Sequence, residues 1–439
     1  MSRNIQERVI NHALCTACGA CAGICPVGAI SMEENAAGFL SAVVNSQQCI
    51  NCGKCLNCCP SVAENKRIEE LYRDLHGVAI AGFIGHAVEK RIRYEGQSGG
   101  VVTSLLLYLL ETGKIDGAIT NQFDPERRRS KATYVDTKQG LLESCGSYYT
   151  QSAVVERARE HSHKRLAAVV LGCQAEAIKL LEQQGHNKPE YLLGLICAGQ
   201  NSGHMIDELI QKSGCSDEEQ PQKFRFRYSH PAYGNWPGNI LMVTDKRRYT
   251  LDKSCRHALK PFYEAYRCLL CYDQMCVEAD LVFGDPWGIE GDHSVGETVI
   301  IAYTEKGLSL LKEAEAAGYV AIEDLAVEKI MAGETVDTQH LPKVACGYSI
   351  CKEKSWEYPY TLSPSADQEL QSHVSKKKRK QYLRRLEYTW ERCLAKTPSD
   401  AYAIKEAYKE SLEKSENIQK WRSRLLLPLR CIRYILRKV

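Results

Sequence analysis

The sequence predicts a multidomain protein of mixed α+β and α/β class, with a small cysteine-rich N-terminal module, a larger α/β body and a helical, basic tail. Three observations predict this: two cysteine arrays in the first sixty residues, alternating strand and helix patterns from residue 78, and positive charge concentrated after residue 360. At 439 residues the chain can hold about two to four domains of ordinary size. We place the domains at residues 1–66, 75–215, 216–350 and 361–439.

Composition and the N-terminus predict a cytoplasmic protein without a membrane span. Apolar residues make up 44% and charged residues 25%, the usual balance of soluble proteins. The first ten residues are polar, and a cysteine array follows where a signal peptide would carry its apolar core. No run of about 18 apolar residues could form a transmembrane helix. In a reducing compartment, 21 cysteines indicate metal ligands rather than disulfides.

The two N-terminal cysteine arrays share one spacing. They read Cys15-x2-Cys18-x2-Cys21-x3-Cys25-Pro26 and Cys49-x2-Cys52-x2-Cys55-x3-Cys59-Pro60. In bacterial two-cluster ferredoxins each 4Fe-4S cluster takes three thiolates from one array and the fourth from the other. We therefore assign one cluster to Cys15, Cys18, Cys21 and Cys59, and the other to Cys49, Cys52, Cys55 and Cys25. Zinc sites use paired knuckles instead. Residues 1–66 are thus predicted to fold like a bacterial ferredoxin, with Cys58 as a packed thiol outside the pattern.

Strand and helix patterns alternate through the first part of the body. Apolar strand patterns occur at residues 78–87, 115–120, 166–171 and 192–196, with amphipathic helices between or after them. This alternation predicts α/β layers around a largely parallel sheet. Cys173 and Cys197 each lie beside glycine at a strand-to-helix turn, where open α/β sheets bind ligands. The polar stretch 61–73, before the body, is interpreted as a linker.

A further cysteine pair, Cys268-x2-Cys271, lies in the second half of the body. A metal site would need two more ligands, either from Cys255 and Cys276 nearby in sequence or from Cys173 and Cys197. Structural thiols, a zinc site and a third iron–sulfur cluster are the three alternatives. Asp285, which precedes Pro286, is interpreted as a turn-capping acid.

The body resembles the beta subunit of coenzyme F420-reducing hydrogenase and its related dehydrogenase subunits. The resemblance covers roughly residues 75–320. It rests on an ordered set of motifs: Gln97-Ser98-Gly99-Gly100, Ile115-Asp116-Gly117, Gly146-Ser147-Tyr148-Tyr149-Thr150-Gln151-Ser152, Gly172-Cys173-Gln174, Ile196-Cys197-Ala198-Gly199, and Cys268-x2-Cys271 followed by Ala279-Asp280 and Gly284-Asp285. Two positions depart from the family, since Tyr148 replaces a usual lysine and Gly172 a usual proline. The resemblance implies FAD, a nearby 4Fe-4S cluster and hydride exchange with a deazaflavin (coenzyme F420) or a similar two-electron partner.

The resemblance also implies which residues hold these groups. A third cluster would bind Cys173, Cys197, Cys268 and Cys271. FAD would bind Gln97, Ser98, Gly99, Gly100, Ser147, Tyr148, Tyr149 and Gln151. No side chain is expected to be catalytic, because a flavin beside clusters itself converts between single electrons and hydride.

The chain is therefore predicted to be a flavin-dependent oxidoreductase that exchanges electrons with a one-electron redox partner protein. The alternatives are a non-catalytic electron-transfer subunit of a larger redox complex, and a regulatory binding protein that uses its clusters as sensors.

The tail carries most of the positive charge, with 19 Lys/Arg against nine Asp/Glu in residues 361–439. The basic run at 376–380 is interpreted as a solvated helix face, and no nucleic acid is expected as a partner. Apolar residues recur at three or four between Ile418 and Leu436, opposite basic residues. Such an amphipathic segment can pack on its own domain, dock a partner protein, or bind peripherally at the inner face of the membrane.

Overall fold

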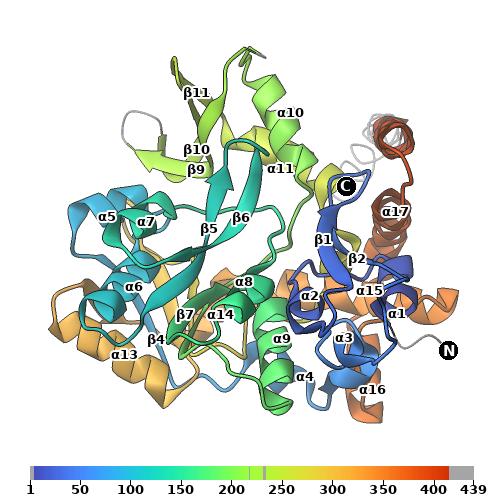
Figure 1. Cartoon of the computed structure of the whole chain (residues 1–439), viewed down its shortest axis with the longest axis horizontal. Helices are drawn as coiled ribbons and strands as arrows, with labels where there is room; N and C mark the ends of the chain where they lie inside the picture. Colours follow the sequence, from blue (N-terminus) through green and yellow to red (C-terminus); the bar gives the residue numbers. More distant parts are fainter. Residues whose placement is uncertain (1–3, 217, 231–233, 415–439) are drawn as a thin grey trace, which may run out of the picture.

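The computed structural model describes residues 4–216, 218–230 and 234–414 (Figure 1). The predicted amphipathic segment between Ile418 and Leu436 lies outside these ranges. Within them, no helix has both the length and the apolar character needed to cross a membrane.

The N-terminal module repeats one turn-and-helix unit beside a β hairpin. Its elements are α1 (Ile5–Arg8), η1 (Ile10–His12), α2 (Ala20–Ile24), β1 (Ile30–Glu34), β2 (Leu40–Val44) and α3 (Lys54–Asn57). Helices α2 and α3 each begin after a glycine with a left-handed backbone, Gly19 with φ 81° and Gly53 with φ 78°. Because these glycines occupy the same place in each array, the two cysteine loops take the same local conformation.

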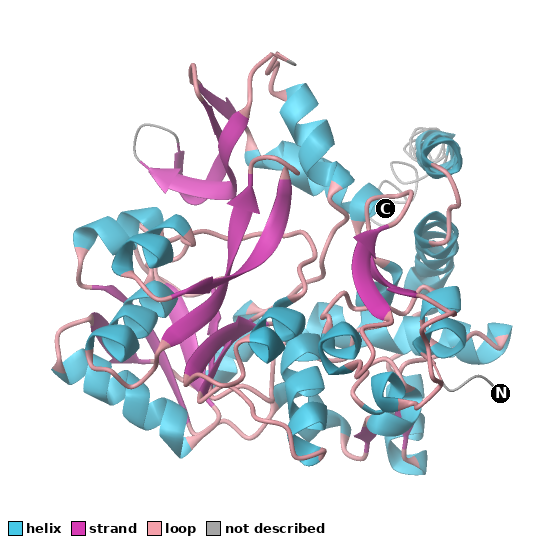
Figure 2. Ribbon diagram, in the orientation of Figure 1, coloured by secondary structure: helices cyan, strands magenta, loops and turns pink. Residues whose placement is uncertain are grey.

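An eight-stranded mixed sheet forms the centre of the body (Figures 1 and 2). Its order is β14-β4-β13-β12-β8-β7-β5-β6. The strands are β4 (Ala81–Ala87), β5 (Gly117–Asp124), β6 (Arg129–Val135), β7 (Leu166–Val170), β8 (Tyr191–Leu195), β12 (Leu281–Gly284), β13 (Thr298–Ala302) and β14 (Val320–Asp324).

Only the four neighbouring strands β12, β8, β7 and β5 run parallel to one another, and every other pair in this sheet is antiparallel. The predicted largely parallel sheet is therefore wrong. Parallel neighbours need a crossover connection, whereas β5 turns directly into β6 and β12 reaches β13 through a loop without a helix.

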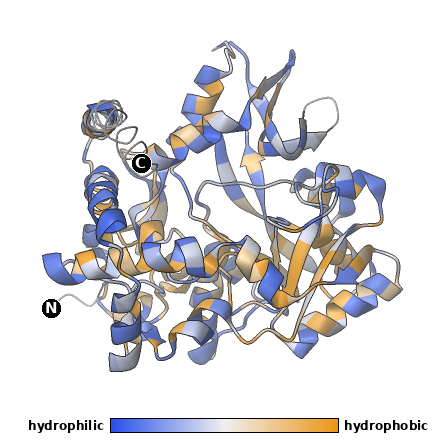
Figure 3. Ribbon diagram, turned by 180° about the vertical axis from the view of Figure 1, so that it is seen from behind, coloured by the Kyte–Doolittle hydropathy of each residue, from blue (hydrophilic) through white to orange (hydrophobic). Residues whose placement is uncertain are grey.

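Helices cover both faces of this sheet. One face carries α5 (Lys90–Glu95), α6 (Val101–Glu111), α7 (Lys138–Glu143) and α13 (Glu305–Ala316), and the other carries α8 (Val154–Glu160), α9 (Gly172–Gln183) and α14 (Val327–Gly333). Alternate strand residues serve the two cores: Ala167 and Leu193 pack on the first face, Ala168 and Leu192 on the second. The central strands are accordingly the most hydrophobic part of the ribbon in Figure 3.

A smaller antiparallel sheet packs beside the large one. It consists of β9 (Pro221–His230), β10 (Gly234–Thr244) and β11 (Arg248–Leu251), and it rests on α10 (His204–Lys212) and α11 (Lys253–Tyr263). Phe224 and Phe226 of β9 are buried in that core. The alternation of β9 therefore directs Arg225 and Arg227 to its opposite side.

The segment predicted to be a linker is packed into the fold. It contains η2 (Ala63–Asn65), β3 (Arg67–Ile68) and the start of α4 (Leu71–His76). Ile68 and Leu71 are buried, and β3 pairs in parallel with β15 (Thr361–Leu362), which comes from the far end of the chain. The linker interpretation is wrong because these few apolar residues pair with partners that are distant in sequence.

The C-terminal region is mainly helical and lies on the side of the molecule that carries the N-terminal module (Figure 1). Its helices are η3 (Val336–His340), α15 (Leu341–Lys354), α16 (Pro364–Ser372), α17 (Lys376–Cys393) and a helical stretch that reaches residue 414. Helix α17 buries Tyr382 and Leu386, while the lysines of its basic run are exposed. This agrees with the solvated-face interpretation.

Candidate functional site

The array cysteines gather in two groups. Burial raises the pKa of Cys21 and of Cys59 well above the ordinary value, and both thiols also interact with Cys15 and Cys18. Burial, followed by the charges of Cys52 and Cys49, raises the pKa of Cys55. Buried thiols form thiolates when a cation such as iron binds them. The structure thus brings together Cys15, Cys18, Cys21 and Cys59 and, separately, Cys49, Cys52 and Cys55.

The two remaining cysteines of the module differ in their surroundings. The Cys25 sulfur accepts a hydrogen bond from the Ala29 amide at 3.2 Å. Cys58 is fully buried, and its sulfur lies 3.6 Å from the Cys55 carbonyl oxygen. Cys58 is packed among the array cysteines and interacts with Cys18 and Cys55, and its assignment as a thiol that binds no iron stays a prediction.

Four body cysteines from distant segments also approach one another. Cys173 begins α9 after β7, Cys197 follows β8, and Cys268 and Cys271 lie in and just after α12 (Tyr266–Leu269). Burial and the charge of neighbouring thiols raise the pKa of Cys197 to about 11 and of Cys268 to about 12. Cys173 is partly buried, and its thiol interacts with all three others. Amides of residues 199 and 200 donate to the sulfurs of Cys197 and Cys268, at 3.4 Å each.

The two local alternatives have packing partners of their own, although Cys276 also interacts with Cys197 of this group. Cys276 is fully buried between strands, since a Cβ on Gly194 of β8 would lie 2.7 Å from its sulfur. Cys255 belongs to α11 and packs in the core under the smaller sheet. Among the described residues, no three Cys, His, Asp or Glu side chains converge closely enough to hold one metal ion. A 4Fe-4S core offers a separate iron to each thiolate, so its ligands stand apart.

A cavity of about 400 Å³ lies at the carboxyl ends of β5, β7, β8 and β12. These are the four parallel strands, and open α/β sheets bind ligands at this edge. Of the predicted flavin residues its wall contains Gln97, Ser98, Gly100, Ser147, Tyr148 and Tyr149. Cys197 also lines it. Gly99 lies behind the wall, and Gln151 instead accepts a hydrogen bond from the Leu40 amide of the N-terminal module at 3.0 Å.

Backbone packing already requires glycine at positions 99 and 100. Their φ angles are 81° and 75°, in the left-handed region that favours glycine. A Cβ on Gly100 would lie 2.5 Å from the Ile92 carbonyl oxygen, and one on Gly99 would lie 3.0 Å from Glu297 Cα. A bulkier residue at either position would therefore disturb this loop whatever the cavity binds.

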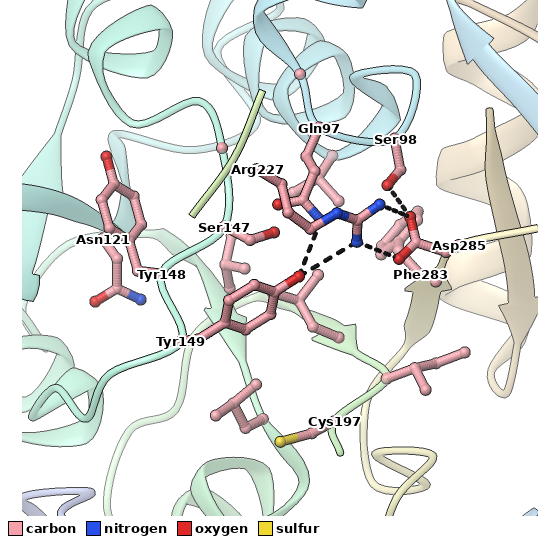
Figure 4. Close-up of a pocket in the computed structure, with 18 of the residues that line it drawn as sticks. Gln97, Ser98, Asn121, Ser147, Tyr148, Tyr149, Cys197, Arg227, Phe283 and Asp285 are labelled. Carbon is pink, nitrogen blue, oxygen red and sulfur yellow. Dashed lines mark hydrogen bonds and ion pairs between the residues drawn. The ribbon is translucent and has the colours of Figure 1, made fainter. Parts of the chain in front are cut away.

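A buried ion pair forms one side of the cavity (Figure 4). Arg227 of β9 donates to both carboxylate oxygens of Asp285, at 2.5 and 3.0 Å. Ser98 and Trp236 donate to the same carboxylate, and Arg227 also donates to the Tyr149 hydroxyl at 3.2 Å. Burial opposes ionisation of Asp285, but the charge and hydrogen bonds of Arg227 lower its pKa overall. The turn-capping interpretation of Asp285 is therefore wrong, because its side chain serves this network.

The rest of the cavity wall carries two basic side chains and several side-chain oxygens that accept no hydrogen bond. Arg256 and Lys260 lie one turn apart on α11 and both line the cavity. Among the described residues, the side-chain oxygens of Gln97, Asn121 and Asn201 are buried without a hydrogen-bond partner, and all three residues line the cavity. Unpaired buried acceptors call for a ligand that donates N–H groups. Acceptors beside cations fit FAD, which has ring N–H groups and a diphosphate.

Glu334 is the acid of this cavity that keeps its proton. Its carboxylate lies against Gly284, where an added Cβ would be 3.0 Å from Oε1. Burial, followed by the nearby charge of Asp285, raises the pKa of Glu334 to about 8. Glu334 is therefore largely protonated at neutral pH.

Replacing Glu334 with glutamine is expected to change how stability depends on pH. Between about pH 5 and pH 8 the folded wild type holds a proton that the unfolded chain releases, so this group's contribution to stability falls as the pH rises. The Glu334→Gln variant does not lose this stability as the pH rises, because glutamine does not titrate. Denaturant unfolding at pH 5 and pH 8 should therefore show the variant gaining relative to wild type at the higher pH, by about 1.4 kcal/mol for each unit of pKa shift realised. An equal difference at both pH values would contradict the assignment.

Two family matches divide the body. Both belong to the family described as "Coenzyme F420 hydrogenase/dehydrogenase, beta subunit": its N-terminal part matches residues 83–157, and its C-terminal part matches residues 163–328. Together these ranges cover more than half of the chain. The chain belongs to this family. A "4Fe-4S dicluster domain" matches residues 14–63, which confirms the predicted cluster-binding module.

Three relatives illustrate the range of this beta-subunit family. The coenzyme F420-dependent sulfite reductase of Methanocaldococcus jannaschii is 27% identical over 354 residues, and the match covers 73% of this chain but 49% of that protein. This chain thus spans about half the length of that relative. The F subunit of the F420H2 dehydrogenase of Methanosarcina mazei is 24% identical, covering 80% of this chain and 96% of that one. The beta subunit of the coenzyme F420 hydrogenase of Methanothermobacter thermautotrophicus is 24% identical, covering 62% and 95%.

Sequence reasoning missed six wall residues: Arg227, Arg256, Lys260, Glu334, Asn121 and Asn201. A signal for the first was available, because arginines alternate with aromatic residues in β9. In such a strand the arginines must face away from the aromatic core. Arg256 and Lys260 share one helical face of a segment that no motif marked. Glu334 carried no local signal.

Proposed function

We propose that this chain is an iron–sulfur flavoprotein oxidoreductase. It would pass electrons between its 4Fe-4S clusters and FAD, and exchange hydride with a deazaflavin such as coenzyme F420 or a similar two-electron partner. One observation carries the proposal: Cys197 belongs both to the group of four body cysteines and to the cavity wall. A flavin in the cavity would therefore lie beside a cluster on Cys173, Cys197, Cys268 and Cys271.

The docking of the N-terminal module supports a continuous route for electrons. The Val155 amide at the start of α8 donates to the Cys18 carbonyl oxygen at 2.9 Å. A Cβ on Gly19 would lie 2.7 Å from the Glu156 Cβ, so the cysteine loop and the helix are in close contact. Cys18 is also among the thiols that interact with Cys173. The cluster on Cys15, Cys18, Cys21 and Cys59 would thus face the body cluster.

Different residues of the cavity wall would bind different parts of FAD. When bound, the flavin ring would supply the conversion between single electrons and a hydride. Gln97, Asn121 and Asn201 would accept its N–H groups, and Arg256 and Lys260 would bind its diphosphate. Glu334 holds a proton at neutral pH on the same wall, so it could exchange that proton with the hydride partner.

The partners belong to the same proposal. Two of the relatives named above are called subunits, of an F420H2 dehydrogenase and of a coenzyme F420 hydrogenase. We infer that this chain works with a one-electron redox partner protein in the cytoplasm.

Chain purified without oxygen is expected to hold about one FAD and about 12 iron and 12 sulfide, since each cluster has four of each. Reduced deazaflavin or another hydride donor should then bleach the flavin absorbance and reduce the clusters in turn. Flavin absorbance and cluster EPR during single-turnover mixing provide the measurement. Iron near eight without flavin would contradict the proposal and favour a protein that carries only the two clusters of the N-terminal module.

A further inference from the structure

A fully buried arginine, Arg267, lies where the cysteine group of the N-terminal module that contains Cys59 meets the group of four body cysteines. Arg267 immediately precedes Cys268, and its side chain is 1% exposed. Its Nε donates to the Ser61 hydroxyl at 2.8 Å, and Nη2 lies 3.4 Å from the Pro60 carbonyl oxygen. Pro60 and Ser61 directly follow Cys59, so the guanidinium contacts the loop of one group, while the backbone of Arg267 belongs to the loop of the other.

The charge of Arg267 has no carboxylate partner in the part of the chain that the structure describes. Its remaining hydrogen bond goes to the Tyr360 hydroxyl at 2.9 Å, and Nη1 is buried without any partner. The thiols of Cys271 and Cys173 are among the groups that interact with this charge. Glu176 also interacts electrostatically with the guanidinium, but it forms no ion pair with it. Glu176 is buried, and burial raises its pKa to about 7.

A buried cation without a counter-ion is strongly unfavourable, so the site calls for negative charge. A 4Fe-4S core held by four thiolates carries net negative charge, and one such core on each side would supply it. We propose that Arg267 is the shared counter-charge of the two clusters bound by Cys15, Cys18, Cys21 and Cys59 and by Cys173, Cys197, Cys268 and Cys271, and that it tunes both reduction potentials together. This inference rests on the proposed body cluster.

The consequence follows from charge. Each cluster becomes more negative when it accepts an electron, so a fixed positive charge between the clusters favours the reduced form of both. Arg267 therefore acts through its charge. It keeps the reduction potentials of both clusters high enough for them to exchange single electrons. The cluster on Cys49, Cys52, Cys55 and Cys25 does not contact Arg267 and should be insensitive to it.

The test is an EPR-monitored redox titration of anaerobically purified full-length chain. Arg267→Met keeps the length of the side chain and removes its charge. We expect the reduction equilibrium of both neighbouring clusters to shift about tenfold towards the oxidised form, which is about 59 mV for a one-electron couple. The cluster on Cys49, Cys52, Cys55 and Cys25 should keep its potential. Arg267→Lys, which preserves the charge, should restore most of the shift.

A control variant, Arg225→Met, removes another buried arginine, which pairs with Glu95. It should leave all three potentials unchanged. If Arg267→Met lost iron and Arg267→Lys regained it, charge would still be the requirement. Unchanged potentials at full iron content, a shift in one cluster alone, or iron loss in both variants would overturn the inference. A wild type with iron near eight would instead refute the body cluster itself, which keeps the two failures distinguishable.

Discussion

Replacing Cys268 with serine is expected to remove about four of about twelve iron atoms per chain, and most of the flavin as well. Position 268 lies far in sequence from the loops that wall the cavity, so a purely local role for this thiol would leave the flavin bound. In the proposed site, however, Cys268 shares a cluster with Cys173 and Cys197, which follow β7 and β8. A metal site built from distant segments contributes its binding free energy to folding, so losing one ligand loosens the strand ends around the cavity.

Iron, acid-labile sulfide and FAD per chain after anaerobic purification provide the measurement. Cys276→Ser is the matched control, because Cys276 is buried in the same region but packs against Gly194 of β8. Cys58→Ser is the corresponding control for the N-terminal module. Both should keep their iron and flavin. If Cys276 proved essential and Cys197 dispensable, the body cluster would be built locally, and the proposed ligand set would be wrong.

Replacing Arg227 with methionine is expected to lower the free energy of unfolding by about 3–5 kcal/mol. The Arg227 side chain is 3% exposed and that of Asp285 is 13% exposed, so the variant leaves a buried carboxylate with only the hydrogen bonds from Ser98 and Trp236. Because the pair borders the cavity, flavin retention should fall with stability. Anaerobic denaturant unfolding and FAD content measure the two effects.

Two further variants separate the buried pair from a general loss of charge. Asp285→Asn in the Arg227→Met background should recover part of the stability, since no unpaired carboxylate then remains. Lys312→Met, which removes a surface ion pair with Glu315, should cost at most about 1 kcal/mol. Strictly additive effects of the two substitutions at 227 and 285 would show that the pair does not act as a unit.

The sequence by itself determined the N-terminal module. Its ligands lie within short loops, and three thiolates separated by two residues each, followed by a fourth and a proline, allow few other structures. Hydrophobic periodicity likewise located four strands of the large sheet, β4, β5, β7 and β8, because that signal is local. The ordered motifs of the body identified the family, and the matches at residues 83–157 and 163–328 confirm it.

The tertiary structure alone decided how these pieces meet. The cysteine pattern left Cys276 and Cys197 as rivals and the family resemblance favoured Cys197, and the structure brings Cys197, which follows β8, close to Cys268. The mixed sheet, the packed segment 61–73 and the ion pair between Arg227 and Asp285 were all hidden for the same reason. Each depends on contacts between residues that are far apart in the chain, and burial of such contacts in one core carries no local pattern that a sequence window can display.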